Sequence, residues 1–347
     1  MRTTDGWAAD GAGRLRRTTL ERRDLRPGDI AVRVDYCGVC HTDLHAVHAH
    51  GHAEEQLVPG HEFTGVVTAV GPQVMDRAVG EAVAVGNIVD ACLECDMCTA
   101  GQENFCREFP TLTYGGRERG DGAMTLGAYS REYVLREDFA YPLPEGLDPA
   151  AAAPLLCAGI TVWEPMRALE VGPGVRVAVV GLGGLGHLAV RLARALGADV
   201  SVISRTAAKT EDARRLGAVD VVISSDEAAM AEARSRFDVL IDTVAVAHEL
   251  SPYLALLALD GTLVHVGYLG PLTVETTELL IGRKRITSAG SGGRRETAAM
   301  LKFCTEHGVV ADIELLPSVR VNEALERLEQ GDVRYRFVLD LSDLDGE

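Results

Sequence analysis

The sequence GLGGLG, at residues 181–186, constrains the fold more than any other part of this chain. It follows VRVAVV, a short apolar run rich in β-branched residues, and it opens the helical pattern LGHLAVRLARALGA. A GxGxxG sequence in this setting is typical of a dinucleotide-binding turn, because its glycines permit a tight turn, a close approach of the pyrophosphate and close helix–sheet packing. The alternative is a tight turn without a ligand. The residues expected to contact the cofactor here are Gly181, Gly183, Gly184, Leu185 and Gly186.

Strand-like and helix-like segments alternate on both sides of this turn. The strand-like segments that follow it are DVSVIS, VDVVIS, FDVLIDTV and GTLVHVG, each separated from the next by a helical pattern. Such alternation predicts a parallel sheet with helices on both faces. We therefore expect residues 158–289 to form a doubly wound Rossmann domain, which places the chain in the α/β class.

The two ends of the chain have a different pattern. Residues 1–157 read as strands and glycine-rich loops, as in DIAVRVDYC, where polar and apolar residues alternate. Residues 290–347 contain two amphipathic helical patterns and a closing strand, YRFVLDL. We expect this tail to return to the first domain, which would then consist of residues 1–157 and 290–347.

The end of the second predicted strand of the nucleotide-binding region bears on the choice of cofactor. An NAD site has an acid here that accepts hydrogen bonds from the ribose hydroxyl groups, but this chain reads VISRTAAK. Ser204 takes the place of the acid, and Arg205 and Lys209 add two positive charges that suit a 2′-phosphate. We predict NADP(H) as the cofactor. The alternative is that both cations are ordinary solvated charges.

Four cysteines lie close together in CLECDMCTAGQENFC, with the spacing C-x2-C-x2-C-x7-C. Four thiolates can surround one tetrahedral ion and leave no open position, so we predict a structural zinc. A redox pair and an iron–sulfur cluster are the alternatives, although the proline that follows the last cysteine in one such cluster motif is Arg107 here. The predicted ligands are Cys92, Cys95, Cys98 and Cys106.

A second group of metal-binding residue types occurs in DYCGVCHTDLHAVHAHGH and PGHEFTG. A catalytic zinc takes about three protein ligands and keeps one position open. From residue types alone, the candidates are Cys37, Cys40, Cys157 and the histidines, including His61 beside Glu62.

The segments CGVCHTDLH, VPGHEFTG, the four-cysteine segment, CAGIT, GLGGLGH and DVRYRFVLD occur in this order. Together they resemble the zinc-dependent medium-chain dehydrogenase/reductases, and the cinnamyl alcohol dehydrogenase-like branch in particular, over residues 7–341. The resemblance implies a GroES-like, β-rich catalytic domain beside the Rossmann domain. It also implies hydride transfer between NADP(H) and an alcohol/aldehyde pair, with two zinc ions per chain.

The resemblance also implies individual roles. Cys40, which directly precedes HTD, would bind the catalytic zinc with His61 and Cys157, and Glu62 could approach the metal. Cys37 and Cys304 would then be small buried side chains. The remaining implied roles are a proton relay through Thr42 and His45, orientation of His61 by Asp43, and cofactor contacts by His41 and Thr161. A plain surface histidine is the alternative for His45.

Two segments depart from the family's usual pattern. VHAHGHAEE carries His48, His50 and His52 where relatives have bulky residues, and we interpret it as a polar, mobile loop rather than a second metal site. SAGSGG has Ser291 near the position of a bulky aliphatic residue. Both changes predict a wider and more polar substrate pocket.

The chain has 34 Lys and Arg against 51 Asp and Glu, a formal charge of −17. Such a charge disfavours nucleic acids and anionic membranes as partners. No membrane span or signal peptide is evident, so we expect a cytoplasmic protein, and the family suggests a homodimer. Two functional alternatives stay open: an NADPH-dependent reductase of an iminium or conjugated double bond, and a non-catalytic NADPH-binding zinc protein.

Overall fold

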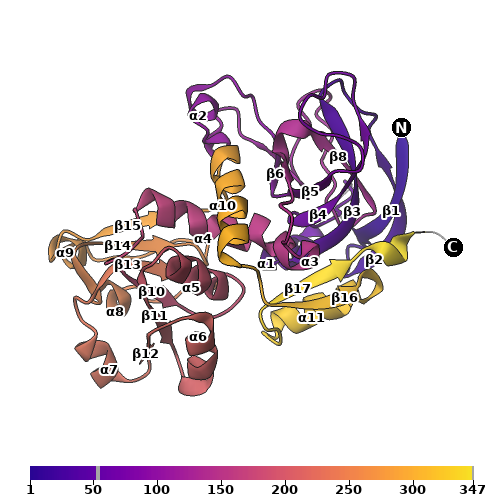
Figure 1. Cartoon of the computed structure of the whole chain (residues 1–347). Helices are drawn as coiled ribbons and strands as arrows, with labels where there is room; N and C mark the ends of the chain where they lie inside the picture. Colours follow the sequence, from indigo (N-terminus) through magenta and orange to yellow (C-terminus); the bar gives the residue numbers. More distant parts are fainter. Residues whose placement is uncertain (52–54, 346–347) are drawn as a thin grey trace. The chain divides into compact units, whose positions relative to one another are not determined.

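The computed structural model describes residues 1–51 and 55–345. The chain divides into two compact units, one made of Met1–Cys157 and Gly292–Glu347 and the other of Ala158–Ser291. The helices and strands of each unit are drawn in Figure 1.

The second unit contains a six-stranded sheet in which all neighbouring strands are parallel. Numbered within the unit, the strand order is 3-2-1-4-5-6, the order of a doubly wound nucleotide-binding sheet. The predicted Rossmann fold is therefore confirmed. In sheet order, the strands are β12 (Asp220–Ile223), β11 (Asp199–Ser204), β10 (Arg176–Val180), β13 (Phe237–Asp242), β14 (Leu257–His265) and β15 (Arg285–Ser288).

Helices cover this sheet because its central strands are apolar on both faces. Strand β10 is buried after its first residue, and α5 packs on β10 and β11. Leu250 and Leu254 pack against Leu240 and Leu263 in one apolar cluster. The helices of the unit are α4 (Ala158–Ala168), α5 (Gly186–Ala195), α6 (Thr210–Leu216), α7 (Glu227–Glu232), α8 (Ser251–Leu254), α9 (Thr276–Leu280) and the 3-10 turn η4 (Ala207–Lys209).

The first unit is built on a mixed sheet that joins the two ends of the chain. Strand β17 (Arg336–Asp340) pairs in parallel with β16 (Ile313–Pro317) and antiparallel with β3 (Asp29–Val39). The path continues from β3 through β4 (Phe63–Val70) and β5 (Ala82–Val85) to β9 (Ala140–Pro142), and β8 (Glu132–Arg136) also pairs with β3. Two further pairs complete the strands: β1 (Arg2–Ala9) with β2 (Leu15–Arg22), and β6 (Ile88–Asp90) with β7 (Thr111–Leu112).

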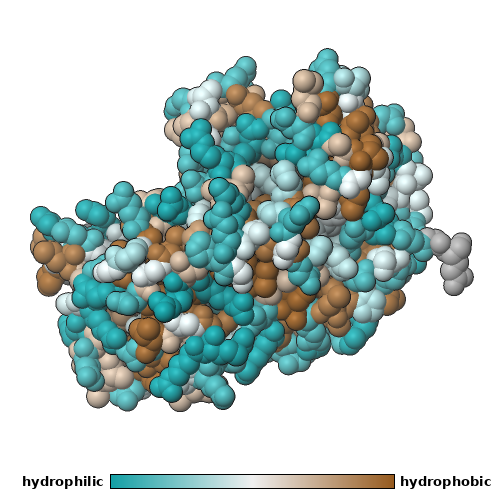
Figure 2. All heavy atoms as spheres, in the orientation of Figure 1, coloured by the Kyte–Doolittle hydropathy of each residue, from teal (hydrophilic) through white to brown (hydrophobic). Residues whose placement is uncertain are grey.

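Short helices connect these strands. They are α1 (His41–His50), α2 (Asp96–Thr99), η1 (Glu103–Phe105), η2 (Glu137–Phe139), α3 (Pro149–Ala152), η3 (Ala153–Leu156), α10 (Arg294–His307), η5 (Ser318–Arg320), α11 (Val321–Glu329) and η6 (Ser342–Leu344). Among the described residues, none of the helices is both long and apolar enough to cross a membrane. Figure 2 shows hydrophilic residues interspersed with apolar ones over the face in view.

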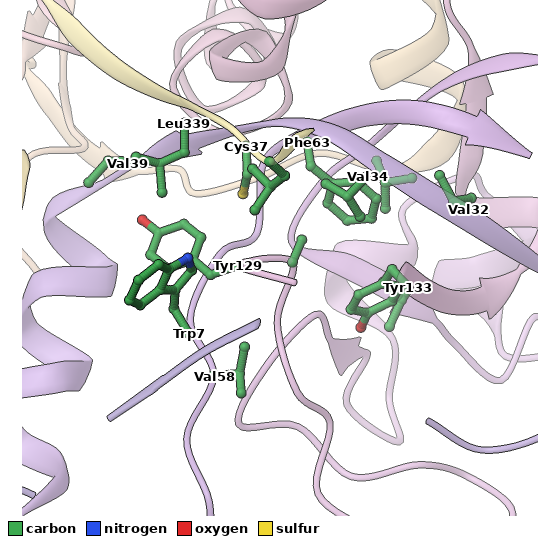
Figure 3. Packing of buried hydrophobic residues seen from close by; sticks show 14 of the residues in the cluster. Trp7, Val32, Val34, Cys37, Val39, Val58, Phe63, Tyr129, Tyr133 and Leu339 are labelled. Carbon is green, nitrogen blue, oxygen red and sulfur yellow. The ribbon is translucent and has the colours of Figure 1, made fainter. Parts of the chain in front are cut away.

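The core of the first unit lies against β3 and β4. Cys37, Phe63 and Tyr129 are fully buried there, beside Leu339 from the closing strand (Figure 3). Cys37 is thus a small core side chain, as predicted, and Cys304 is equally buried on α10. The alternation of β3 directs Cys37 and Val39 to the same buried side. The next cysteine, Cys40, follows the end of this strand and directly precedes α1.

Candidate metal centres and cofactor loop

Cys40, His61 and Cys157 lie close together in the first unit. Their ligand atoms are all within 4.8 Å of one another. The sulfur atoms of Cys40 and Cys157 are 3.9 Å apart, and His61 Nε2 lies 3.2 Å from the Cys157 sulfur. Two thiolates bound to one tetrahedral zinc at about 2.3 Å would be about 3.8 Å apart, so the donor set fits zinc and leaves one position open.

The pairing of β3 with β4 brings the first two of these residues together. Cys37 is opposite Phe63, and the Gly38 backbone N–H donates to the Glu62 carbonyl at 2.8 Å. Cys40, just after the end of β3, therefore lies near His61, just before the start of β4. Cys157 joins them from the segment after η3, which packs on β3 and β4.

Asp43 contacts His61 of this cluster and is fully buried. His61 Nδ1 lies 3.0 Å from Asp43 Oδ1, and the Gly60 backbone N–H donates to the same oxygen at 3.1 Å. Because a carboxylate accepts, His61 Nδ1 carries the proton and Nε2 keeps its lone pair for a metal. The Cys40 backbone N–H donates to Asp43 Oδ2 at 2.9 Å, which also caps the start of α1.

The four remaining clustered cysteines form a second group. The ligand atoms of Cys92, Cys95, Cys98 and Cys106 are within 4.8 Å of one another, and the sulfur atoms of Cys92 and Cys98 are 3.8 Å apart. Backbone N–H groups of Arg107 and Cys98 lower the pKa of Cys95 to about 6, which favours a thiolate. Four sulfur donors in this arrangement fit a closed tetrahedral zinc site.

The glycine loop of the second unit runs from β10 into α5. Gly181 has a φ of 86°, which only glycine adopts without strain, and a Cβ atom at Gly186 would lie 2.2 Å from the Gly181 carbonyl oxygen. A Cβ atom at Gly183 would meet nothing within 4 Å, so the backbone there is open to a ligand. Gly184 and Leu185 complete the turn before α5 begins at Gly186. The loop therefore fits a bound pyrophosphate at a helix N-terminus.

Comparison with known proteins agrees with this geometry. Residues 26–145 match the alcohol dehydrogenase GroES-like domain, and residues 184–306 match the zinc-binding dehydrogenase family. The NADP-dependent alcohol dehydrogenase C of Mycobacterium bovis is 43% identical over 347 residues, which cover 99% of this chain and 100% of that protein. The chain belongs to the zinc-binding alcohol dehydrogenases. The predicted family and the GroES-like and Rossmann folds are confirmed.

Other relatives of this zinc-binding alcohol dehydrogenase carry different substrate names. The probable formaldehyde dehydrogenase AdhA of Bacillus subtilis is 44% identical over 333 residues, 95% of each chain. The structure of a cinnamyl alcohol dehydrogenase from Sorghum bicolor has a TM-score of 0.93 at 44% identity and covers 98% of both chains. Relatives of similar identity are thus named for substrates as different as formaldehyde and cinnamyl alcohol.

The electrostatics of the Cys40 site suit a cation. The Cys157 thiol, which donates toward Cys40, lowers the pKa of Cys40 well below the ordinary value despite burial. Burial alone would lower the pKa of His61, but the Asp43 carboxylate and Cys40 raise it well above the ordinary value. A divalent ion bound between these side chains would compensate the negative charge of the two thiolates.

Glu62 lies apart from the three clustered residues of the dehydrogenase. Its Oε1 accepts a hydrogen bond from Arg336 Nη2, and the Oε2 atom has no hydrogen-bond partner among the described residues. Burial raises the pKa of Glu62 above its ordinary value, while the Arg336 guanidinium opposes that shift. The approach of Glu62 to a metal stays a prediction.

Arg336, Tyr129 and Tyr114 were missed by the sequence analysis. Arg336 is buried on β17 beside Glu62, Tyr129 donates to Asp43 Oδ2 at 3.2 Å, and the Tyr114 ring lies 5.8 Å from that of His61. The segment DVRYRFVLD contributed to the family resemblance, and its arginine in an apolar strand was the available signal for Arg336. The tyrosines carried no such signal, because aromatic residues are common in any core.

Thr42, His45 and His41 lie on α1. All three are exposed, and the rings of His41 and His45 are 6.3 Å apart. Thr42 Oγ1 lies 3.7 Å from the Cys40 sulfur, which places its hydroxyl beside the three-residue cluster.

The interpretation of VHAHGHAEE as a loop is wrong for residues 47–50. Helix α1 continues to His50, because Leu44 and Val47 lie on one buried face and α1 packs on α11. His48 faces Glu329 at 4.0 Å. His52 lies outside the described residues, and within the described ranges the two cysteine-containing clusters are the only groups of three or more side chains with metal-binding geometry.

The residues predicted to select NADP(H) surround the end of β11. Ser204 is buried and donates to the Thr206 carbonyl at 2.9 Å, whereas Arg205 is exposed. Lys209 Nζ donates to the Leu182 carbonyl at 2.7 Å, so its charge lies against the glycine loop. Thr161, on α4, accepts a hydrogen bond from the Ser291 backbone N–H at 3.3 Å.

Proposed function

We propose that the protein transfers a hydride between NADP(H) and an alcohol/aldehyde pair, with a catalytic zinc held by Cys40, His61 and Cys157. The observation that supports this most directly is the convergence of these three donors within 4.8 Å, with no fourth ligand among the described residues. Zinc in such a site acts as a Lewis acid that polarises a carbonyl or acidifies an alcohol. NADP(H) supplies or accepts the hydride, and the protein aligns the reactants.

Side chains near the metal would transfer the proton between the substrate oxygen and solvent. The Thr42 hydroxyl, 3.7 Å from the Cys40 sulfur, would hydrogen-bond the substrate oxygen. His45 follows one helical turn later on α1 and is exposed, so it would pass the proton to solvent. Asp43 would keep His61 in the tautomer that binds metal, through the 3.0 Å contact with Nδ1.

Cys92, Cys95, Cys98 and Cys106 would hold a second zinc. Because four thiolates fill the coordination sphere, this ion would stabilise the segment between β6 and β7 and would take no part in the chemistry. The expected content is therefore two zinc ions per chain. Elemental analysis of protein expressed with sufficient zinc measures this, and a content of one ion would remove one of the two sites.

Cofactor binding would involve the glycine loop, Thr161 and His41, with Ser204, Arg205 and Lys209 selecting the 2′-phosphate. An acid at position 204 would repel that phosphate, and Ser204 is neutral. Arg205 is exposed and unobstructed, and Lys209 already places its ammonium against the loop. Each charge-assisted contact to a phosphate contributes about 1.5–3 kcal/mol, roughly tenfold or more in affinity.

The proposal is tested with a panel of aldehydes and both reduced cofactors. We expect aldehyde-dependent NADPH oxidation, and tighter binding of NADPH than of NADH. Ser204→Asp should reverse the preference, and Arg205→Ala should weaken NADPH about tenfold and leave NADH nearly unchanged. Arg214→Ala, which removes an exposed arginine from α6, is the matched control. Equal affinities of the wild type for the two cofactors would contradict the proposed role of this segment.

The same assay separates the two alternatives. A protein that holds NADPH without turnover would bind the cofactor and oxidise none of it with any aldehyde. A reductase of iminium or conjugated double bonds would act on those substrates and ignore simple aldehydes. The hydroxyl and imidazole on α1 favour the carbonyl reaction, since that reaction needs a proton at oxygen.

Two further points belong to the proposal. The eight cysteines form no disulfides, which agrees with a reducing, cytoplasmic location. A homodimer would be formed through the edge strand β15, where Leu280 and Ile281 are 75% and 71% exposed next to the strand. Size measurement in solution tests the dimer, and Leu280→Glu should weaken it.

A further inference from the structure

Tyr129 is a fully buried residue of the first unit, and its hydroxyl contacts Asp43. The hydroxyl donates to Asp43 Oδ2 at 3.2 Å, where the Cys40 backbone N–H also donates at 2.9 Å. The other carboxylate oxygen, Oδ1, is contacted by His61 Nδ1 at 3.0 Å and by the Gly60 N–H at 3.1 Å. Each oxygen of Asp43 therefore has two donors, and Tyr129 supplies one of the four.

The ring of Tyr129 is held firmly. A Cβ atom at Gly60 would lie 2.6 Å from the ring, so the absence of a side chain there lets the ring pack directly against the backbone of Gly60, the residue before His61. On the other side, the Trp7 backbone N–H donates to the Tyr129 carbonyl at 2.7 Å. In Figure 3 the Tyr129 hydroxyl points toward the Val39 end of β3, from which Asp43 follows. A buried group held in this way can fix the orientation of the carboxylate that it contacts.

We propose that Tyr129 is a positioning residue for the catalytic zinc: its hydroxyl holds the Asp43 carboxylate so that His61 Nε2 stays directed at the metal. The inference rests on the proposed function of the Cys40, His61 and Cys157 group. Without the hydroxyl, Asp43 Oδ2 keeps only the Cys40 N–H of its two donors, and the carboxylate can rotate away from His61. His61 would then lose the partner that fixes its tautomer and its ring.

Tyr129→Phe tests this, because it removes one oxygen and keeps the ring. Loss of groups that support a metal ligand typically weakens metal binding by 10–100-fold. We expect Tyr129→Phe to release one of the two zinc ions to a chelator on the order of tenfold faster than the wild type. The four-cysteine site should release its ion at an unchanged rate. Iodoacetamide labelling would assign the loss, since Cys40 and Cys157 would become reactive while Cys92 stays protected.

Tyr133→Phe is the matched control. Tyr133 is buried in the same core (Figure 3), but its hydroxyl donates to the Thr113 carbonyl at 2.6 Å and not to Asp43. It should leave the release of both ions unchanged. In the zinc-loaded enzyme, Tyr129→Phe should lower kcat and leave the affinity for NADPH unchanged.

Three results would overturn the inference. The first is zinc release from Tyr129→Phe at the wild-type rate. The second is equally faster release from both zinc sites, and the third is equally faster release from Tyr133→Phe. The last two would mean a general loosening of the core. The zinc-release test also distinguishes a failure of this inference from a failure of the proposed hydride transfer. If the wild type oxidises no NADPH with any aldehyde but Tyr129→Phe still loses one zinc selectively, the positioning role stands and the proposed function fails.

Discussion

The two groups of candidate zinc ligands in the first unit differ in how they are built. Cys92, Cys95, Cys98 and Cys106 come from one short segment, and their sulfur atoms meet within 4.8 Å. Cys40, His61 and Cys157 meet just as closely but come from three segments that the sheet brings together. The first group surrounds an ion completely, and the second leaves a position open for a substrate.

This difference shows which kind of site a sequence reveals. Ligands on one loop are close for any fold of the chain, so their spacing alone predicts a tetrahedral site. Ligands on separate segments become close only after β3 pairs with β4 and η3 packs on both. Residue types alone left Cys37 and Cys40 as equal candidates, and the family resemblance was needed to choose between them.

The largest effect should come from the open site. Cys40→Ser removes a thiolate ligand, and loss of Lewis-acid assistance worth several kcal/mol lowers turnover by roughly 10³-fold or more. The unfolding temperature should change little, because Cys40 is partly exposed at the start of α1. Cys37→Ala, in the core three residues earlier, should keep its turnover. Steady-state kinetics and thermal unfolding of both variants check this, and full activity of Cys40→Ser would remove the distinction between the sites.

The closed site should show the reverse pattern. Cys92→Ser breaks the four-sulfur shell, and loss of a structural metal ranks among the largest single-residue effects on stability, roughly 4 kcal/mol or more. We expect a lower unfolding temperature and rapid proteolysis between β6 and β7, while the correctly folded fraction keeps its turnover per bound catalytic zinc. Limited proteolysis with mass spectrometry measures this. A stable but inactive Cys92→Ser protein would reverse the two assignments.

A smaller effect on turnover is expected from a residue beside the open coordination position of the catalytic zinc. Thr42→Ala removes the hydroxyl that we place on the substrate oxygen, and a single acid–base group typically contributes about a hundredfold. We expect kcat to fall by about this factor and NADPH affinity to stay constant, because the Thr42 hydroxyl would contact the substrate oxygen and not the phosphate-binding loop. Thr42→Ser retains the hydroxyl and should restore most of the rate. An unchanged rate for Thr42→Ala would favour a reaction without protonation at oxygen.

The sequence predicted the Rossmann sheet well, because parallel buried strands are apolar throughout and a glycine turn marks the first of them. It did not predict helix α1. Only Leu44 and Val47 form its apolar stripe, which is too short to indicate a helix by its pattern. Gly51, where the helix ends, stands among histidines that we interpreted as part of a loop. The pairing of Arg336 with Glu62 and of Tyr129 with Asp43 escaped prediction because each joins positions far apart in the chain. The arginine in an apolar strand indicated a buried charge but not its partner.

The pairing of β17 with β3 has a consequence for how the protein is made. Strand β17 lies between β16 and β3, so the sheet of the first unit is incomplete until residues 336–340 have been synthesised. The second unit is continuous, from Ala158 to Ser291, and can fold on the ribosome before β17 emerges. Arg336 is the first residue of β17, so Glu62 gains its ion pair with Arg336 only at that moment. A nascent chain would therefore carry a finished nucleotide-binding domain and an open-edged sheet at the same time, and chaperone binding should be concentrated on residues 1–157.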